Sequence, residues 1–306
     1  MERKISFENV KKAVDAAYQA NKANADGAVD PRLDAAPADF AISVVLTDGR
    51  KYEVGDSTKG APLGDIAKVP VAITLLSQLD GKECGCGCGC KCGDAKKPKP
   101  EIPVSRHGVR MVSRIAPSSD ADGKWDVIMD TVLNMTAEAP VLDDALYKSL
   151  TAQNEKEDTV NRLAQAGYEL YDDATIAVDL YTRLTALKFT TGNLAALGAT
   201  LAADGRNPFT GQFAFDGKYA PTAVAAMAVK GHGKIHRRWL VRTGVPAKAG
   251  FGGLMVAVLP GFGAIAAYSP LLDCNAVPAK AAAAIKDITF TLGLNVFASA
   301  RVQVEP

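Results

Sequence analysis

Residues 40–56, FAISVVLTDGRKYEVGD, carry the strongest structural signal in the chain. A β-branched run is followed by Asp48-Gly49 and then by a second run in which polar and apolar residues alternate. Asp-Gly between two such runs is a preferred turn of an antiparallel β-hairpin. The stretch therefore predicts two paired strands early in the chain.

The rest of the chain reads mainly as helix around this hairpin. Helices are predicted where apolar residues recur three or four positions apart, namely in 6–22, 64–79, 125–135, 143–153, 158–166, 173–187, 195–203 and 278–292. Residues 253–268 form a second apolar hairpin pattern around Pro260-Gly261. Strands thus come from both ends of the chain, and helices come from its middle.

This order predicts an α+β fold, an antiparallel sheet flanked by helices with a second, mainly helical lobe. We expect one domain, residues 1–306. Its sheet lobe would be formed by about 1–80 and 240–306, and its helical lobe by about 104–239. Residues 81–103 are rich in Cys, Gly, Lys and Pro and predict a surface loop between the two.

The overall charge argues against two classes of partner. The 35 basic and 34 acidic residues nearly cancel, so neither nucleic acid nor an anionic membrane is indicated as a partner. No apolar run reaches the roughly 20 residues that a membrane-spanning helix needs. The N-terminus is charged and amphipathic, unlike a signal peptide. We expect a soluble cytoplasmic protein.

Five of the six cysteines lie within one short run of the predicted loop, at Cys84, Cys86, Cys88, Cys90 and Cys92. A disulfide framework would spread its cysteines along the chain. Clustered thiolates bind soft metals, so Cu(I), Zn or an iron–sulfur cluster is predicted here. The C-x-C spacing is similar to that of metallothionein segments. The alternative is a flexible loop with no fixed ligand.

Several segments, mostly in the second half, are similar to one known family. They are 42–56, ISVVLTDGRKYEVGD, Asp179 to Arg183 (D-x-Y-T-R), LAALGATLA at 194–202, GRNP at 205–208, VRTGVPAKAGFGG at 241–253 and SPLLD at 269–273. On these motifs the chain resembles the bacterial glutaminases from about Phe40 to Phe297. The resemblance implies a β-lactamase-like fold, a homo-oligomer, and acyl-enzyme hydrolysis of glutamine to glutamate and ammonia.

The resemblance also marks four candidate catalytic positions. The family's S-x-x-K segment, which supplies the nucleophilic serine and a lysine one helical turn away, reads Asp65-Ile66-Ala67-Lys68 here. The lysine is therefore present as Lys68, while Asp65 stands where the serine is expected. Tyr181 matches the tyrosine of D-x-Y-T-R, and K-S-G reads Lys248-Ala249-Gly250.

Other positions implied by the family differ as well. Its Asn of N-A-G falls at Arg106, followed by His107 and Gly108; its substrate-binding Glu falls at Leu150, the next Asn at Glu157, a second Tyr at Gly233, and a Tyr expected near Asp30-Pro31-Arg32 is missing. A leucine cannot pair with the charged α-amino group of glutamine, and an unpaired buried charge is costly.

Two interpretations follow. In the first, the protein has lost glutamine hydrolysis and carries a Cys-rich loop for metal binding or assembly. In the second, it is an active glutaminase or related amidohydrolase with altered catalytic residues. Attack by a carboxylate on a primary amide would give an anhydride, so Asp65 is predicted to form an i,i+3 ion pair with Lys68 instead. With Arg106 and Lys248 nearby, a closed salt-bridge network is favoured over a small-molecule or anion site.

Overall fold

The central element is a five-stranded antiparallel sheet. The computed structural model describes residues 2–79, 105–168, 170–231, 236–299 and 301–305. The sheet has the order β4-β3-β10-β9-β8, formed by β3 (Ala41–Leu46), β4 (Lys51–Gly55), β8 (Ala247–Ala249), β9 (Leu254–Leu259) and β10 (Gly263–Tyr268). Both predicted hairpins are confirmed, since β3 pairs with β4 and β9 with β10.

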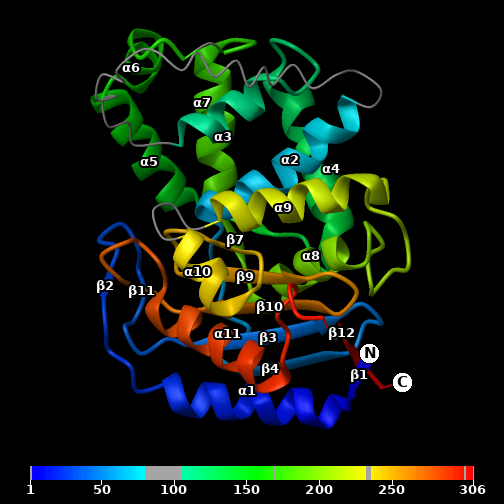
Figure 1. Cartoon of the computed structure of the whole chain (residues 1–306). Helices are drawn as coiled ribbons and strands as arrows, with labels where there is room; N and C mark the ends of the chain where they lie inside the picture. Colours follow the sequence, from blue (N-terminus) through cyan, green and yellow to red (C-terminus); the bar gives the residue numbers. More distant parts are fainter. Residues whose placement is uncertain (1, 80–104, 169, 232–235, 300, 306) are drawn as a thin grey trace, which may run out of the picture.

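Helices cover both faces of this sheet. On one face, α1 (Phe7–Asn21) packs beside α11 (Ala279–Leu292), and on the other lies α8 (Thr191–Ala202) (Figure 1). Every residue of β3, β9 and β10 is therefore buried. This burial explains why these strands read as continuous apolar runs rather than as alternating ones.

Helix α8 is buried along its whole length. Thr190 caps its first turn by accepting a hydrogen bond from the Asn193 amide at 3.1 Å. Gly198 allows the close approach to the sheet, because a Cβ there would lie 2.6 Å from Cβ of Ala264. The helix thus joins the sheet to the helical lobe.

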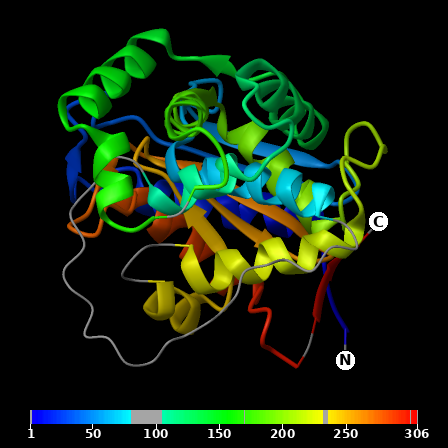
Figure 2. The same ribbon diagram turned by 90° about the horizontal axis from the view of Figure 1, so that it is seen from above.

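The second lobe consists of helices stacked above the sheet in Figure 1, and Figure 2 looks down on them. They are α2 (Lys68–Gln78), α3 (Arg106–Ser113), α4 (Ala121–Met135), α5 (Asp144–Lys156), α6 (Thr159–Gln165), α7 (Ala174–Thr185) and α9 (Ala220–Lys230), with α10 (His236–Thr243) nearer the sheet. The α+β fold is confirmed. The predicted lobe boundaries remain a prediction. Helix α2, which falls in the segment assigned to the sheet lobe, packs on α3 and α4.

Besides the central sheet, the described residues form three small sheets. One pairs β1 (Glu2–Ile5) with β12 (Arg301–Val304), and another pairs β2 (Ala28–Val29) with β11 (Leu271–Leu272). In the third, β7 (Leu187–Phe189) lies between β5 (Ala61–Pro62) and β6 (Val141–Leu142). The described residues also form the 3-10 turns η1 (Gly64–Ala67) and η2 (Gly217–Tyr219). The β1–β12 pair is parallel and brings the two termini together (Figure 1). Within the described residues, no helix is both long and apolar enough to cross a membrane.

Candidate active site

Asp65 and Lys68 lie at the junction of η1 and α2, between the two lobes. The 3-10 turn runs directly into the helix, which sets the two side chains one turn apart. Lys68 Nζ lies 2.9 Å from Asp65 Oδ2. The predicted ion pair is therefore present, although the Asp65 side chain keeps 46% of its surface exposed.

The second oxygen of the Asp65 carboxylate is occupied by Tyr181 from α7. The Tyr181 hydroxyl donates a hydrogen bond to Asp65 Oδ1 at 3.1 Å. Burial of the ring, then the negative charge of Asp65 and this hydrogen bond, raise the pKa of Tyr181 well above its usual value, while a hydrogen bond with Ser105 acts in the opposite direction. Tyr181 is therefore a proton donor at neutral pH and does not serve as a base.

Gly108 leaves the space that the Tyr181 ring occupies. It lies in α3, and a Cβ at this position would fall 2.1 Å from Cζ of Tyr181. The resemblance placed this glycine in the N-A-G segment, and the structure supplies a steric reason for it. Only a residue without a side chain allows α3 and α7 to approach this closely.

We expect Gly108→Ala to lower the free energy of unfolding by about 1–3 kcal/mol, because the buried ring must move to accept the methyl group. Denaturant unfolding would measure this loss. Gly60→Ala is the matched control, since its Cβ would first meet Cβ of Lys188 at 3.3 Å. A Gly108→Ala protein as stable as this control would contradict the assignment.

Lys248, the third charged member of the cluster, comes from the edge strand β8. Its side chain is buried, with 7% of the residue exposed. Desolvation, followed by the charge of Lys68, lowers the pKa of Lys248 to about 8, while Asp65 acts in the opposite direction. Burial also acts to raise the pKa of Asp65, but the charges of Lys68 and Lys248 and the hydrogen bonds from Lys68 and Tyr181 outweigh it, so that pKa is lowered.

Other positions that the resemblance marked have partners outside this cluster. Arg106 begins α3 and, among the described residues, makes no hydrogen bond or ion pair to Asp65. Glu157 pairs with Arg162 at 2.9 Å. Leu150 is buried in an apolar cluster that includes Phe251. The predicted salt-bridge network is therefore wrong in part: within the described residues Asp65 forms an ion pair with Lys68 but with neither Arg106 nor Lys248, and Tyr181 binds its other oxygen instead.

Phe251 is a site residue that the sequence analysis missed. Its ring covers Gly64, since a Cβ at Gly64 would lie 3.0 Å from Cδ1 of Phe251. The Arg32 guanidinium lies over the Phe251 ring, 4.7 Å from its centre, and forms an ion pair of 2.5 Å with Asp30. An aromatic residue within the otherwise small K-A-G-F-G-G segment was the available signal.

The predicted metal ligands, Cys84, Cys86, Cys88, Cys90 and Cys92, lie outside the described residues, as does Gly233. Within the part of the chain that the structure describes, no group of three or more His, Cys, Asp or Glu side chains could hold a metal ion. Cys274 is exposed and free. The metal-binding hypothesis therefore stays a prediction from the cysteine spacing.

Comparison with known proteins agrees with the fold. The profile of the family described as glutaminase matches residues 29–297. The chain belongs to the glutaminase family. It is 32% identical to a glutaminase of Bacteroides fragilis and 33% identical to one of Parabacteroides distasonis, and each alignment covers 99% of both chains.

Solved structures of glutaminases have the same fold. The structure of the probable glutaminase ybaS superposes with a TM-score of 0.84 at 27% identity, covering 96% of this chain and 100% of the other. A probable glutaminase from Bacillus subtilis, complexed with 6-diazo-5-oxo-L-norleucine, superposes with a TM-score of 0.77 at 20% identity and covers 95% and 96% of the two chains. This second likeness shows the fold alone.

The arrangement restricts the chemistry open to Asp65. Its two oxygens are engaged by Lys68 and Tyr181, and its lowered pKa keeps it ionised at neutral pH. An ionised carboxylate has no hydroxyl proton for a neighbouring lysine to remove, so the proton transfer that activates a serine is not available here. The cluster can hold charge and donate hydrogen bonds from Lys68, Tyr181 and Lys248.

Proposed function

We propose that this member of the glutaminase family no longer hydrolyses glutamine, because Asp65 replaces the nucleophilic serine. The protein would keep the fold as a scaffold for binding or assembly. The main support is the engagement of both carboxylate oxygens of Asp65, by Lys68 at 2.9 Å and by Tyr181 at 3.1 Å. A carboxylate in this position pairs with the lysine that a serine nucleophile would use as its base.

The surroundings of Leu150 add independent support. Leu150 packs with Leu146 and Ala186, and the partly buried Phe251 lies against the same cluster. An apolar cluster offers no counter-charge to an α-amino group, and burying an unpaired ammonium is costly. Substrate recognition, as the family resemblance implies it, would therefore be weakened separately from the chemical step.

A second candidate function is an active glutaminase with altered catalytic residues, converting glutamine to glutamate and ammonia. Relatives named glutaminase, 32–33% identical over 99% of the chain, favour it. The presence of Lys68, Tyr181 and Lys248 at family positions also fits this candidate. The two candidates make opposite predictions about ammonia release.

We expect the purified protein to release ammonia from glutamine at least about 10⁴-fold more slowly than the Bacteroides fragilis glutaminase assayed in parallel, because removing a catalytic nucleophile costs this much or more. A coupled ammonia assay at equal enzyme concentrations would measure the ratio. A rate within about tenfold of the relative's would instead establish the second candidate.

Covalent labelling refines this test. The Bacillus subtilis glutaminase forms a covalent complex with 5-oxo-L-norleucine by reaction with 6-diazo-5-oxo-L-norleucine. The same reagent should give no mass adduct on the protein described here. An adduct mapped to Asp65 would show that the carboxylate is nucleophilic after all and would overturn the proposal.

We further propose that the run from Cys84 to Cys92 binds a soft metal ion or joins subunits of a homo-oligomer in the cytoplasm, where thiols remain reduced. Its support is the C-x-C spacing, with five thiols in one short stretch. Neither metal binding nor subunit assembly by this run would depend on the chemistry at Asp65.

A further inference from the structure

A small cavity lies beside Asp65, between α2, α3, α9 and β8. Its volume is about 130 Å³. Its lining combines two chemically different sets, the apolar Val69, Ala72, Met111, Ala223, Ala226 and Met227 and the basic Lys68, His107, Lys230 and Lys248. Figure 2 shows α9, which supplies four of these lining residues, along one edge of the helical lobe. Drug-sized ligands occupy pockets of about 300–1,000 Å³, so this one fits a smaller molecule.

Among the described residues that line this cavity, four are basic and none is acidic. The Asp65 carboxylate is paired with Lys68 at 2.9 Å. The Lys248 residue is 7% exposed, and its ammonium shares the negative charge of Asp65 with Lys68. Desolvation of a lysine is unfavourable, so an anion in the cavity would give Lys248 a further counter-charge.

His107 supplies the imidazole among the lining residues. Desolvation, followed by the charges of Lys230, Lys68, Arg110 and Lys248, lowers the pKa of His107. The lining is therefore charged mainly by its lysines. A neutral imidazole can still donate one hydrogen bond to a bound oxygen.

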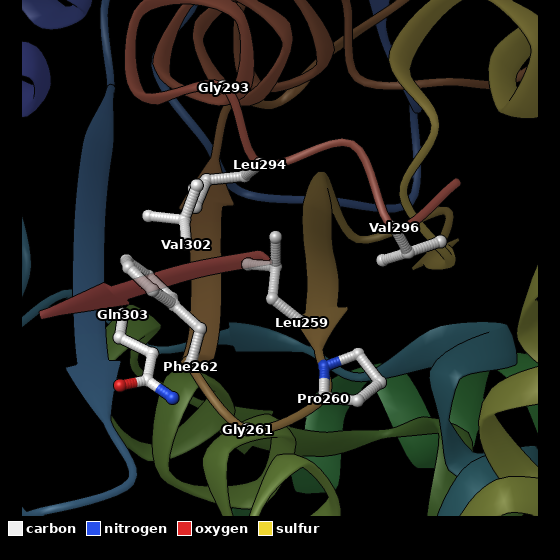
Figure 3. A pocket seen from close by; sticks show the side chains of 9 residues that line it. All are labelled: Leu259, Pro260, Gly261, Phe262, Gly293, Leu294, Val296, Val302 and Gln303. Atoms are coloured by element: carbon white, nitrogen blue, oxygen red, sulfur yellow. The ribbon is translucent and has the colours of Figure 1, made fainter. Parts of the chain in front are cut away.

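Another cavity of the described structure lacks this combination. Figure 3 shows a larger one of about 300 Å³ at the β9–β10 turn, near β12, and Gln303 is the one polar side chain among its nine lining residues. That cavity offers apolar surface and no ionisable group. The cavity beside Lys248 has both apolar walls and three lysines among its lining residues.

We propose that this cavity binds a small monoanion with an apolar body, such as an aromatic or short-chain aliphatic carboxylate. The carboxylate would pair with Lys248 and Lys230, and the body would lie against Val69, Met111 and Met227. The lining includes Lys68 and Lys248, two of the candidate catalytic positions, but none of Arg106, Leu150 and Glu157, which the resemblance matches to other positions of the family's site. The cavity therefore adjoins the site at Asp65, and binding is tested by a measurement that does not involve hydrolysis.

The apolar walls exclude more polar anions. Inorganic phosphate would leave several oxygens against methionine and alanine side chains, and glutamate would bury an α-amino group among lysines; both arrangements are unfavourable. Benzoate and hexanoate satisfy the carboxylate at one end and the walls at the other. Benzamide, which has the shape of benzoate without its charge, is the appropriate neutral comparison.

Ligand-observed NMR and calorimetric titration of the full chain would test the proposal without any measurement of activity. Benzoate or hexanoate should bind saturably in the millimolar range or tighter, and benzamide roughly tenfold more weakly or worse, since a charge-assisted hydrogen bond is lost. Lys248→Met should weaken benzoate by roughly tenfold or more. Lys286→Met, an exposed lysine on α11, should leave binding within about twofold.

Ala72→Phe fills the cavity without changing its charge and should abolish benzoate binding while the thermal midpoint stays near that of the wild type. The proposal is overturned if benzoate and hexanoate do not saturate, if benzamide or phosphate binds as well as benzoate, or if Lys248→Met binds like the Lys286→Met control. Failure of binding would leave the ammonia assay above unaffected, so the two proposals fail separately.

Discussion

Replacing Lys124 by methionine is expected to lower the free energy of unfolding by about 3–5 kcal/mol. Lys124 in α4 is 1% exposed, and its ammonium lies 3.0 Å from Oδ2 of Asp172, which is 5% exposed. The ammonium also donates to the carbonyl oxygen of Ile115 at the end of α3. Methionine fills a similar volume but leaves the Asp172 carboxylate buried without its counter-ion.

Lys188→Met is the matched control for this change. Lys188 lies 3.0 Å from Asp143, the same separation as in the buried pair, but the lysine side chain is 42% exposed. Its loss should cost less than about 1 kcal/mol, because solvent screens an exposed pair. Urea unfolding of both variants measures the difference, and equal losses would show that burial does not determine the strength of the Lys124 pair.

The same pair predicts a dependence on pH. The backbone hydrogen bond from Ser119, with further help from Lys124, lowers the pKa of Asp172 well below its ordinary 3.8. A group whose folded pKa is depressed stabilises the fold above its unfolded pKa and loses that contribution as the pH falls toward the folded pKa. The stability difference between wild type and Asp172→Asn should therefore be constant at neutral pH and shrink below about pH 4.

The regular part of the fold was predictable because its signals are local. The turn residues Asp48-Gly49 and Pro260-Gly261 mark the two hairpins, and helical spacing marks α1, α2 and α11. Helix α8 was predicted to begin at 195 and begins at Thr191 instead, because its first turn is buried and capped by Thr190. Complete burial removes the polar face that would have marked its first turn.

Other elements depend on contacts distant in sequence. The strands β1 and β12 are short and mostly polar, and they form because the two ends of the chain meet. Helix α9 is alanine-rich, with little contrast between its faces, and was missed for that reason. Likewise, the position of Phe251 over Gly64 follows from the turn between β8 and β9, which no local pattern encodes.

In the candidate site, too, the contacts between residues close in sequence were predictable and the others were not. The pairing of Asp65 with Lys68 was predicted, because three positions apart on a helix is a local relation. The choice between Tyr181 and Arg106 as the further partner was not, since α7 and α3 both approach η1 only in the folded lobe. The cavity at Lys248 is likewise a product of tertiary packing, because its lining comes from four separate elements.

A second substitution with a large expected effect is Asp65→Ser. A serine at position 65 would have a candidate base and a hydrogen-bond donor beside it. Lys68 follows one helical turn later, with its ammonium 2.9 Å from the present carboxylate, and the Tyr181 hydroxyl is 3.1 Å away on the other side. A positioned base contributes about 10²–10⁴-fold to such a reaction. Exchange of the carboxylate for a hydroxyl removes one half-exposed ion pair and should cost little stability.

Asp65→Ser is therefore expected to convert an unreactive site into one that a fluorophosphonate labels at position 65, as measured by intact mass and peptide mapping. Adding Lys68→Met should slow labelling by roughly 10²-fold or more, because the base is removed. Asp39→Ser is the matched control, since Asp39 also pairs with a lysine, Lys59, but away from the cluster. Glutamine hydrolysis should stay low in Asp65→Ser, because Leu150 still offers no charge to the substrate's amino group. Labelling that is absent from folded Asp65→Ser, or unaffected by Lys68→Met, would show that the cluster no longer supports activation of a nucleophile.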